Sequence, residues 1–182
     1  MRDIKAIFLD VDGKLTYCGS GTADSEGIDQ EKVKLLKRIV DETGAVIILS
    51  SSWKYGYDRI SGEKQHFYRV LEEQLDKCGL KIFDITPDIS VEFDGDVDQR
   101  ITETTLENLH HLKVKHGTGR AAEVQKWIKE NAPDKFVILD DEDYDWAEYG
   151  FADNWIQPCW FDINGGLNDD HVKRAIEILS KL

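Results

Sequence analysis

The chain has 182 residues, 41% of them hydrophobic, which is typical of one globular domain with its own core. Its formal net charge of −13 argues against an extended surface for duplex nucleic acid, because such surfaces depend on clustered Lys and Arg. No apolar run approaches the roughly 18 residues of a membrane span, and the first residues lack the apolar stretch of a signal peptide. We therefore expect one domain over residues 1–182, no membrane contact and a cytoplasmic location. The oligomeric state stays open.

The first half of the chain predicts strands that alternate with helices. Residues 4–9 form an apolar, β-branched run typical of a buried strand. Asp29 suits the N-cap of a helix with an apolar stripe, and Gly44 is placed to end it. Further elements are expected as a strand at residues 45–49, a helix near residues 65–78 and a strand at residues 80–85.

The second half continues this alternation after one irregular stretch. Residues 89–102 alternate in part around the letters DGD, so we expect a hairpin or small flap within residues 87–119. A helix at 120–131, strands at 136–139 and 155–156, and a final helix capped by Asn168 or Asp169 complete the prediction. The pattern predicts an α/β fold with a mainly parallel sheet of about five strands, covered by helices on both faces.

Polar side chains follow three of these strands. They are the pair Asp10 and Asp12, the run Ser50 to Ser52, and the pair Asp140 and Asp141. In open parallel sheets the functional crevice lies beyond the carboxyl ends of the strands. Carboxylates crowded there would raise one another's pKa unless a cation neutralises them. Oxygen ligands with no His or Cys beside them favour Mg²⁺.

The pair after the first strand also has a chemical use. A carboxylate such as Asp10 is a reasonable nucleophile toward phosphorus. Asp12, two residues on, can protonate the leaving oxygen and then deprotonate the attacking water. A calcium loop would need Glu twelve positions into the motif, where this chain has Gly21, so that alternative is excluded.

These motifs resemble those of the haloacid dehalogenase (HAD) superfamily. FLDVDG is similar to the first motif in its phosphatase form with two aspartates, VIILSSSW to the second and FVILDDEDYD to the fourth, in the right order. The narrower pattern is similar to the capless HAD domains grouped with RNA-repair proteins. The resemblance implies a three-layer, Rossmann-like HAD fold that is capless or carries a small flap.

The resemblance implies roles for the acids. Asp10 would be the nucleophile and Asp12 the general acid/base. Mg²⁺ would be bound by Asp10, by the backbone carbonyl of Asp12 and by Asp141, with Asp140 and Asp145 as lesser candidates.

It also implies contacts to the phosphoryl group. The hydroxyl of Ser50 and the amide of Ser51 would hold its oxygens, and Gly13 and Lys14 are further substrate-binding candidates. The family often has Thr where this chain has Lys14, which is the main departure from the pattern.

The third motif of the family supplies a basic residue that offsets the charge of nucleophile and phosphate. No unambiguous Lys stands at that place in this chain. We assign the position to Arg120, at the expected start of a helix, with Lys115 as the alternative.

The function expected from these features is a Mg²⁺-dependent phosphomonoester hydrolase with an aspartyl-phosphate intermediate. A phosphotransferase would use the same acids, and a non-catalytic, metal-binding regulatory protein is the alternative from another class. No large cap fits between the first two motifs, so an open site is expected. An open site suits a bulky phosphorylated substrate, and we favour a nucleotide or a polynucleotide terminal phosphate.

Overall fold

Five parallel strands form one sheet in the order β3-β2-β1-β4-β5. The computed structural model describes residues 4–16, 27–92, 115–159 and 165–181. The strands are β1 (Lys5–Leu9), β2 (Val46–Leu49), β3 (Ile82–Ile85), β4 (Lys135–Leu139) and β5 (Trp155–Ile156). The mainly parallel sheet expected from the sequence is confirmed, and β1 lies at its centre.

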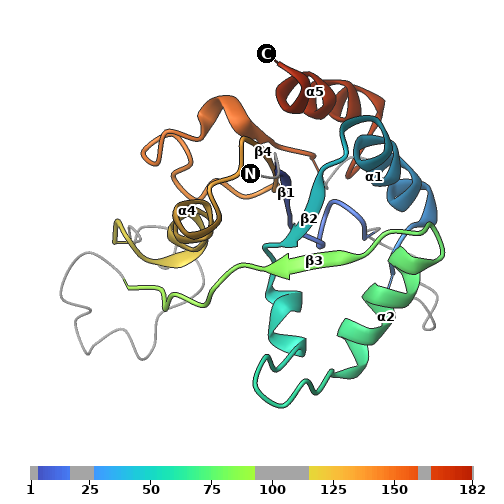
Figure 1. Cartoon of the computed structure of the whole chain (residues 1–182), viewed down its shortest axis with the longest axis horizontal. Helices are drawn as coiled ribbons and strands as arrows, with labels where there is room; N and C mark the ends of the chain where they lie inside the picture. Colours follow the sequence, from blue (N-terminus) through green and yellow to red (C-terminus); the bar gives the residue numbers. More distant parts are fainter. Residues whose placement is uncertain (1–3, 17–26, 93–114, 160–164, 182) are drawn as a thin grey trace, which may run out of the picture.

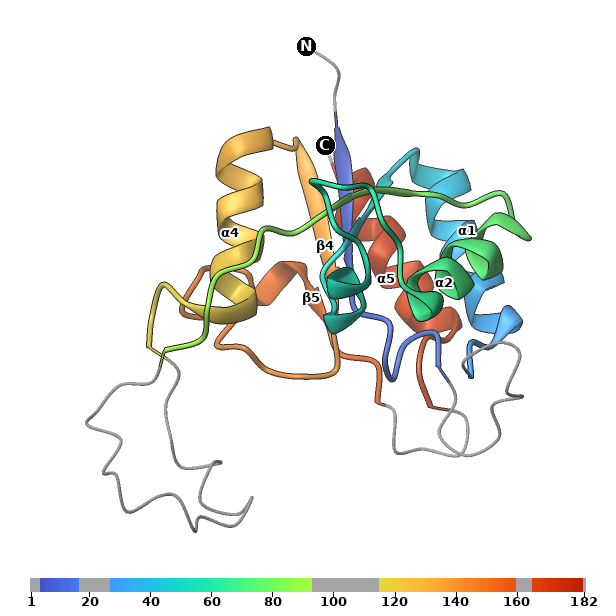
Figure 2. The ribbon, with the colours of Figure 1, turned by 90° about the horizontal axis from the view of Figure 1, so that it is seen from below.

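Four α-helices cover the sheet within the described residues. They are α1 (Gln30–Thr43), α2 (His66–Asp76), α4 (Gly119–Asn131) and α5 (Asp169–Ser180), with short 3₁₀ helices η1 (Ser52–Gly56) and η3 (Ala152–Asn154). Figures 1 and 2 show α1 and α5 side by side on one face, with α4 on the opposite face. The result is the helix–sheet–helix arrangement that a buried parallel sheet requires.

Local signals set the helix boundaries. The side chain of Asp29 accepts a hydrogen bond from the amide of Glu31 at the start of α1, and Gly44 ends this helix in the left-handed region with φ 70°. Asn168 caps α5 by accepting from the amides of Asp170 and His171. These caps confirm the expected ends, because each satisfies backbone groups that the helix itself leaves unpaired.

The alternating side chains of β1 build a core on each side of the sheet. Ile7 and Leu9 pack with α1, α2 and α5, whereas Ala6 and Phe8 face α4. On that second side the ring of Phe8 meets Trp127 of α4 edge to face, with centroids 5.3 Å apart. Since both faces of β1 are buried, this strand fixes the position of the residue that follows it, Asp10.

The expected hairpin at residues 89–102 lies mostly in residues 93–114, outside the described part of the chain. Residues 86–92, which are described, form no strand. None of the helices in the described ranges has both the length and the apolar character needed to cross a bilayer.

Candidate active site

The sheet places three predicted site residues at one edge. Asp10, Ser50 and Asp140 are each the first residue after a strand, and each donates its backbone N–H to a neighbouring strand. Asp10 N bonds Leu139 O at 3.0 Å, Ser50 N bonds Leu9 O at 2.8 Å and Asp140 N bonds Ile156 O at 3.3 Å. These bonds extend the parallel ladder by one residue. The functional groups are therefore fixed by the sheet itself.

The order of the strands makes this edge a crevice. From β1 the chain builds outward through β2 and β3, and then returns to the other side of β1 with β4 and β5. Such a reversal leaves an opening beyond the carboxyl ends of the two strands that flank it, here β1 and β4. Asp10 follows β1, and Asp140 and Asp141 follow β4, so all three lie at this reversal of the strand order.

Asp10, Asp140 and Asp141 form a carboxylate cluster, in which one oxygen of each lies within 4.8 Å of the others. Asp10 is 5% exposed and Asp140 is 1% exposed. Burial, more than any neighbouring charge, raises the pKa of Asp140 to about 6. Of the two lesser metal candidates, Asp140 belongs to this cluster, whereas Asp145 is exposed in a left-handed turn with φ 59°.

Arg120 bridges two members of the cluster. Its Nη1 lies 2.9 Å from Asp10 Oδ1 and 2.9 Å from Asp140 Oδ2. Burial acts to lower the pKa of Arg120, but the carboxylates of Asp140 and Asp10 outweigh it and raise the pKa. The alternative residue, Lys115, is exposed and forms an ion pair with Glu92 at 2.7 Å. The structure thus places Arg120, at the start of α4, beside the expected nucleophile.

Lys14 does not lie where we expected it. Its side chain has no exposed surface, and its ammonium group is 2.5 Å from Asp10 Oδ2, with a second ion pair to Asp141 Oδ1. The sequence suggests Lys14 as a substrate contact, but the structure buries its side chain inside the carboxylate cluster. The cluster attracts the ammonium because burial removes the water that would otherwise solvate three neighbouring carboxylates.

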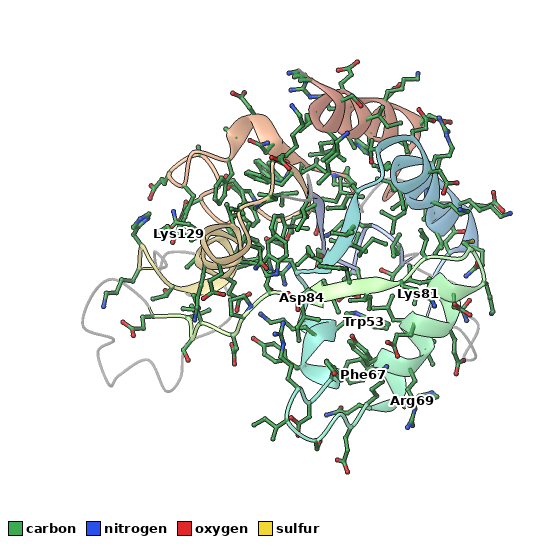
Figure 3. All side chains as sticks on the ribbon, viewed as in Figure 1. Trp53, Phe67, Arg69, Lys81, Asp84 and Lys129 are labelled. Carbon is green, nitrogen blue, oxygen red and sulfur yellow. The ribbon has the colours of Figure 1, made fainter. Side chains whose placement is uncertain are left out.

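Asp12 turns away from the cluster toward η1. Trp53 donates its indole Nε1–H to both carboxylate oxygens of Asp12, at 3.1 and 3.0 Å. Burial raises the pKa of Asp12, the hydrogen bond from Trp53 lowers it, and the net direction is upward. The ring of Trp53 packs edge to face on Phe67 of α2, and Figure 3 shows the two side chains next to each other. No local signal in the sequence indicated this contact.

The serines after β2 divide into two roles. Ser51 caps η1, because its hydroxyl accepts from the amide of Trp53 at 3.4 Å. Ser50 is 3% exposed, and its hydroxyl has no hydrogen-bond partner among the described residues. The cap of η1 is thus formed by Ser51, whereas the hydroxyl of Ser50 is buried and takes no part in it.

Gly13 serves the turn after β1. Its φ is 73°, in the left-handed region that glycine adopts without strain, and its N–H donates to the hydroxyl of Thr16 at 2.9 Å. The structure thus gives Gly13 a place in the turn, and its contact with substrate stays a prediction.

A pocket of about 180 Å³ opens beside Arg120. Its walls come from η1, from residues 88–91, from the start of α4 and from Tyr144; the lining residues are Ser51, Ser52, Lys54, Tyr55, Asp88, Ile89, Ser90, Val91, Gly119, Arg120, Glu123 and Tyr144. The guanidinium of Arg120 lies over the ring of Tyr144, 4.8 Å from its centroid. Larger hollows of about 440 and 410 Å³ lie along β3 and α2, away from the cluster.

A buried ion pair that we did not anticipate joins two walls of this pocket. Lys54 Nζ of η1 lies 2.6 Å from Glu123 Oε2 of α4, with side chains 5% and 7% exposed. Lys54 also donates to the carbonyl of Pro87 at 3.0 Å. Nothing in the sequence near either residue indicates the other, because only the folded sheet brings η1 and α4 together.

The donors at the cluster fit a hard divalent cation. Three carboxylates converge, two of them are almost fully buried, and the cluster already attracts an ammonium group. Oxygen-only ligands of this kind favour Mg²⁺ over metals that prefer His or Cys.

A comparison with models of protein families identifies the family to which the chain belongs. The model for the HAD domain in Swiss Army Knife RNA repair proteins matches residues 6–172. The chain belongs to this family. HAD domains typically use Mg²⁺, and membership supports a HAD-type phosphatase or phosphoesterase in general. A search of curated proteins gave no match for this HAD domain.

Proposed function

We propose that the protein is a Mg²⁺-dependent phosphomonoester hydrolase that acts through an aspartyl-phosphate on Asp10. The observation that carries the proposal is the setting of Asp10. Its carboxylate ends the central strand, is almost fully buried, and has one oxygen on Arg120 and the other on Lys14. In the metal-free protein these two cations offset the negative charge of the buried carboxylate, and a carboxylate is a suitable nucleophile toward phosphorus.

In the first step an oxygen of Asp10 attacks phosphorus, and the bond from phosphorus to the leaving oxygen breaks. Asp12 gives its proton to that leaving oxygen. In the second step Asp12 takes a proton from water, the water oxygen attacks phosphorus, and the carboxylate of Asp10 is released with inorganic phosphate. The pKa of Asp12 is raised from its ordinary value, and a raised pKa favours the protonated form that a general acid needs.

Neighbouring groups support the charge that develops on the phosphoryl oxygens. Mg²⁺, held by Asp10, Asp141 and the backbone carbonyl of Asp12, would offset part of this negative charge. Arg120 is placed to offset more of it from the rim of the pocket, where its side chain is 16% exposed. The unpaired hydroxyl of Ser50 is suited to donate to a phosphoryl oxygen.

For the substrate we propose a nucleotide or a polynucleotide terminal phosphate. The family description refers to RNA repair proteins, which supports a nucleic-acid end. The pocket beside Arg120 has the rings of Tyr55 and Tyr144 in its walls, and aromatic rings of this kind stack on bases. The charge of −13 favours contact with a strand end over contact with a long duplex.

The test is hydrolysis of p-nitrophenyl phosphate with Mg²⁺, with EDTA, and by the Asp10→Asn variant. We expect turnover that needs Mg²⁺ and disappears in the variant. Asp145→Asn is the matched control, because Asp145 is exposed outside the cluster and Asn tolerates its left-handed backbone. Turnover that persists in EDTA or in Asp10→Asn contradicts the mechanism.

A second series compares nucleoside monophosphates with oligonucleotides that carry a terminal phosphate. Release of inorganic phosphate identifies a hydrolase. Transfer of the phosphate to an added alcohol or nucleoside would identify a phosphotransferase instead. Binding of Mg²⁺ without turnover of any of these esters would favour the non-catalytic alternative.

A further inference from the structure

The proposed mechanism assigns no catalytic step to Lys14. Its ammonium group contacts Asp10 Oδ2 and Asp141 Oδ1, and it is 3.9 Å from Asp140 Oδ1. These three residues are also those whose oxygens converge as a candidate metal site. The ammonium therefore lies at the position where a cation would meet all three carboxylates.

The two cations of the site are not equivalent. Arg120 approaches from the pocket and occupies the other oxygen of Asp10, Oδ1, together with Asp140 Oδ2. Lys14 does not line the pocket and has no exposed surface. Lys14 therefore contacts Oδ2 of Asp10, the oxygen that Arg120 does not contact. It also contacts Oδ1 of Asp141.

An ammonium group and Mg²⁺ cannot both contact the same carboxylate oxygens. Each needs the space next to the oxygen, and positive charges at contact distance repel each other strongly in a buried site. We propose that Lys14 is a built-in competitor for the metal: its ammonium neutralises the cluster when Mg²⁺ is absent and must leave before Mg²⁺ binds. This inference rests on the proposed function, because it concerns the same metal site.

The backbone at Lys14 stays in place during such an exchange. Its carbonyl accepts from Leu167 N at 3.2 Å, and a Cβ at Gly166 would lie 3.0 Å from that same carbonyl oxygen. The exchange would move the side chain, and a lysine side chain has four rotatable carbon links. The exchange therefore requires rotation of one side chain and no change in the fold.

The test is a calorimetric Mg²⁺ titration of the wild type and of Lys14→Met, which keeps the bulk of the side chain and removes its charge. We expect Lys14→Met to bind Mg²⁺ about tenfold more tightly or better, because no cation has to be displaced. We also expect it to melt at a lower temperature in EDTA, with a larger gain on adding Mg²⁺. Equal or weaker Mg²⁺ binding by Lys14→Met overturns the inference.

Two further variants separate the possible failures. Lys54→Met removes another buried lysine, one that pairs with Glu123 away from the cluster, so it should lower stability without tightening Mg²⁺ binding. Asp141→Asn should weaken Mg²⁺ binding. If it does not, the metal site of the proposed function is wrong. If it does while Lys14→Met gains nothing, only the competitor role of Lys14 fails.

A measurement on the wild type keeps the inference testable if Lys14→Met does not fold. The side-chain ammonium signal of Lys14, assigned by NMR with ¹⁵N labelling, should exchange slowly with water in EDTA because the group is buried and ion-paired. Saturating Mg²⁺ should shift this signal and speed its exchange. An unchanged signal at saturation would show that the metal binds without displacing Lys14.

Discussion

The indole N–H of Trp53 lies within hydrogen-bonding distance of both carboxylate oxygens of Asp12, at 3.1 and 3.0 Å. This contact ties η1, which follows β2, to the turn that follows β1. It fixes the direction of the proposed general acid and lowers its pKa against the effect of burial. Trp53 is thus a positioning residue in the proposed mechanism.

We predict that Trp53→Phe lowers kcat about tenfold, because a hydrogen bond to a charged group is worth roughly 1.5–3 kcal/mol and the Asp12 site is partly exposed to water. Loss of the bond also raises the pKa of Asp12 further. Since Asp12 must be ionised to activate water, the fall of kcat on the acid side should move to higher pH. A pH profile of kcat checks this.

Trp127→Phe is the matched control for that profile. Trp127 loses a comparable indole bond, to Asp84 Oδ2 at 2.7 Å, but it lies on α4 away from Asp12. Trp127→Phe should lower the stability of the fold. The pH at which kcat falls on the acid side of the profile should stay unchanged. If this pH shifts in both Trp53→Phe and Trp127→Phe, or in neither, the proposed role of Trp53 is contradicted.

Ser50→Ala should separate stability from activity. The hydroxyl of Ser50 is buried without a partner among the described residues, so removing it costs the fold no hydrogen bond. We expect an unchanged or slightly higher melting temperature, since an unpaired buried polar group costs about 1–3 kcal/mol. We expect kcat/KM to fall about tenfold or more, with weaker inhibition by vanadate. A clear loss of stability would show that Ser50 supports the fold instead.

Arg120→Ala should lower kcat about 100-fold or more, because it removes the group that offsets charge on the phosphoryl oxygens and leaves Asp10 and Asp140 without their bridge. Arg120→Lys should recover only part of this loss, since a single ammonium replaces a planar group with several donors. Steady-state kinetics of the two variants check the prediction. Arg38→Ala removes an exposed pair with Asp169 and should change neither kcat nor KM.

We predict that the folded protein loses stability at alkaline pH because Tyr68 is buried. Its side chain is 3% exposed, and burial raises its pKa to about 12. A pKa raised above the unfolded value of about 10 means that the folded state keeps the proton longer, so stability falls as the pH rises from 10 to 12. At pH 11 this group alone should cost about 1 kcal/mol.

Urea unfolding at pH 8 and pH 11 measures that cost. Tyr68→Phe cannot ionise, so the difference in unfolding free energy between wild type and variant should change between the two pH values, in favour of the variant at pH 11. A difference that stays constant would show that Tyr68 ionises as easily in the folded protein as in the unfolded chain.

The sequence was sufficient for the five strands and the four α-helices of the described residues, because these depend on local signals. Asp29 and Gly44 mark the ends of α1, and the apolar run before Asp10 marks the central strand. In a parallel sheet, residues that follow neighbouring strands must lie near one another, so the meeting of Asp10 with Asp141 could also be predicted.

The directions of individual side chains could not be predicted in the same way. The sequence suggests Lys14 as a substrate contact, and lysine is rarely buried, yet the electrostatic attraction of three carboxylates draws its side chain inside. The choice between Asp140 and Asp145 depends on the turn after β4, where Asp145 takes a left-handed conformation. The pair of Lys54 with Glu123 depends on the packing of η1 against α4.

The position of β1 between β2 and β4 also has a consequence for synthesis on the ribosome. Ile7 pairs with Ile47 on one side and with Val137 on the other. The nascent chain therefore carries β1 with one open edge until β4 emerges, and such edges attract other unpaired strands. During that interval Asp10 and Lys14 lack Asp140 and Asp141, so the charges of the site are completed only when β4 and the residues after it have been made.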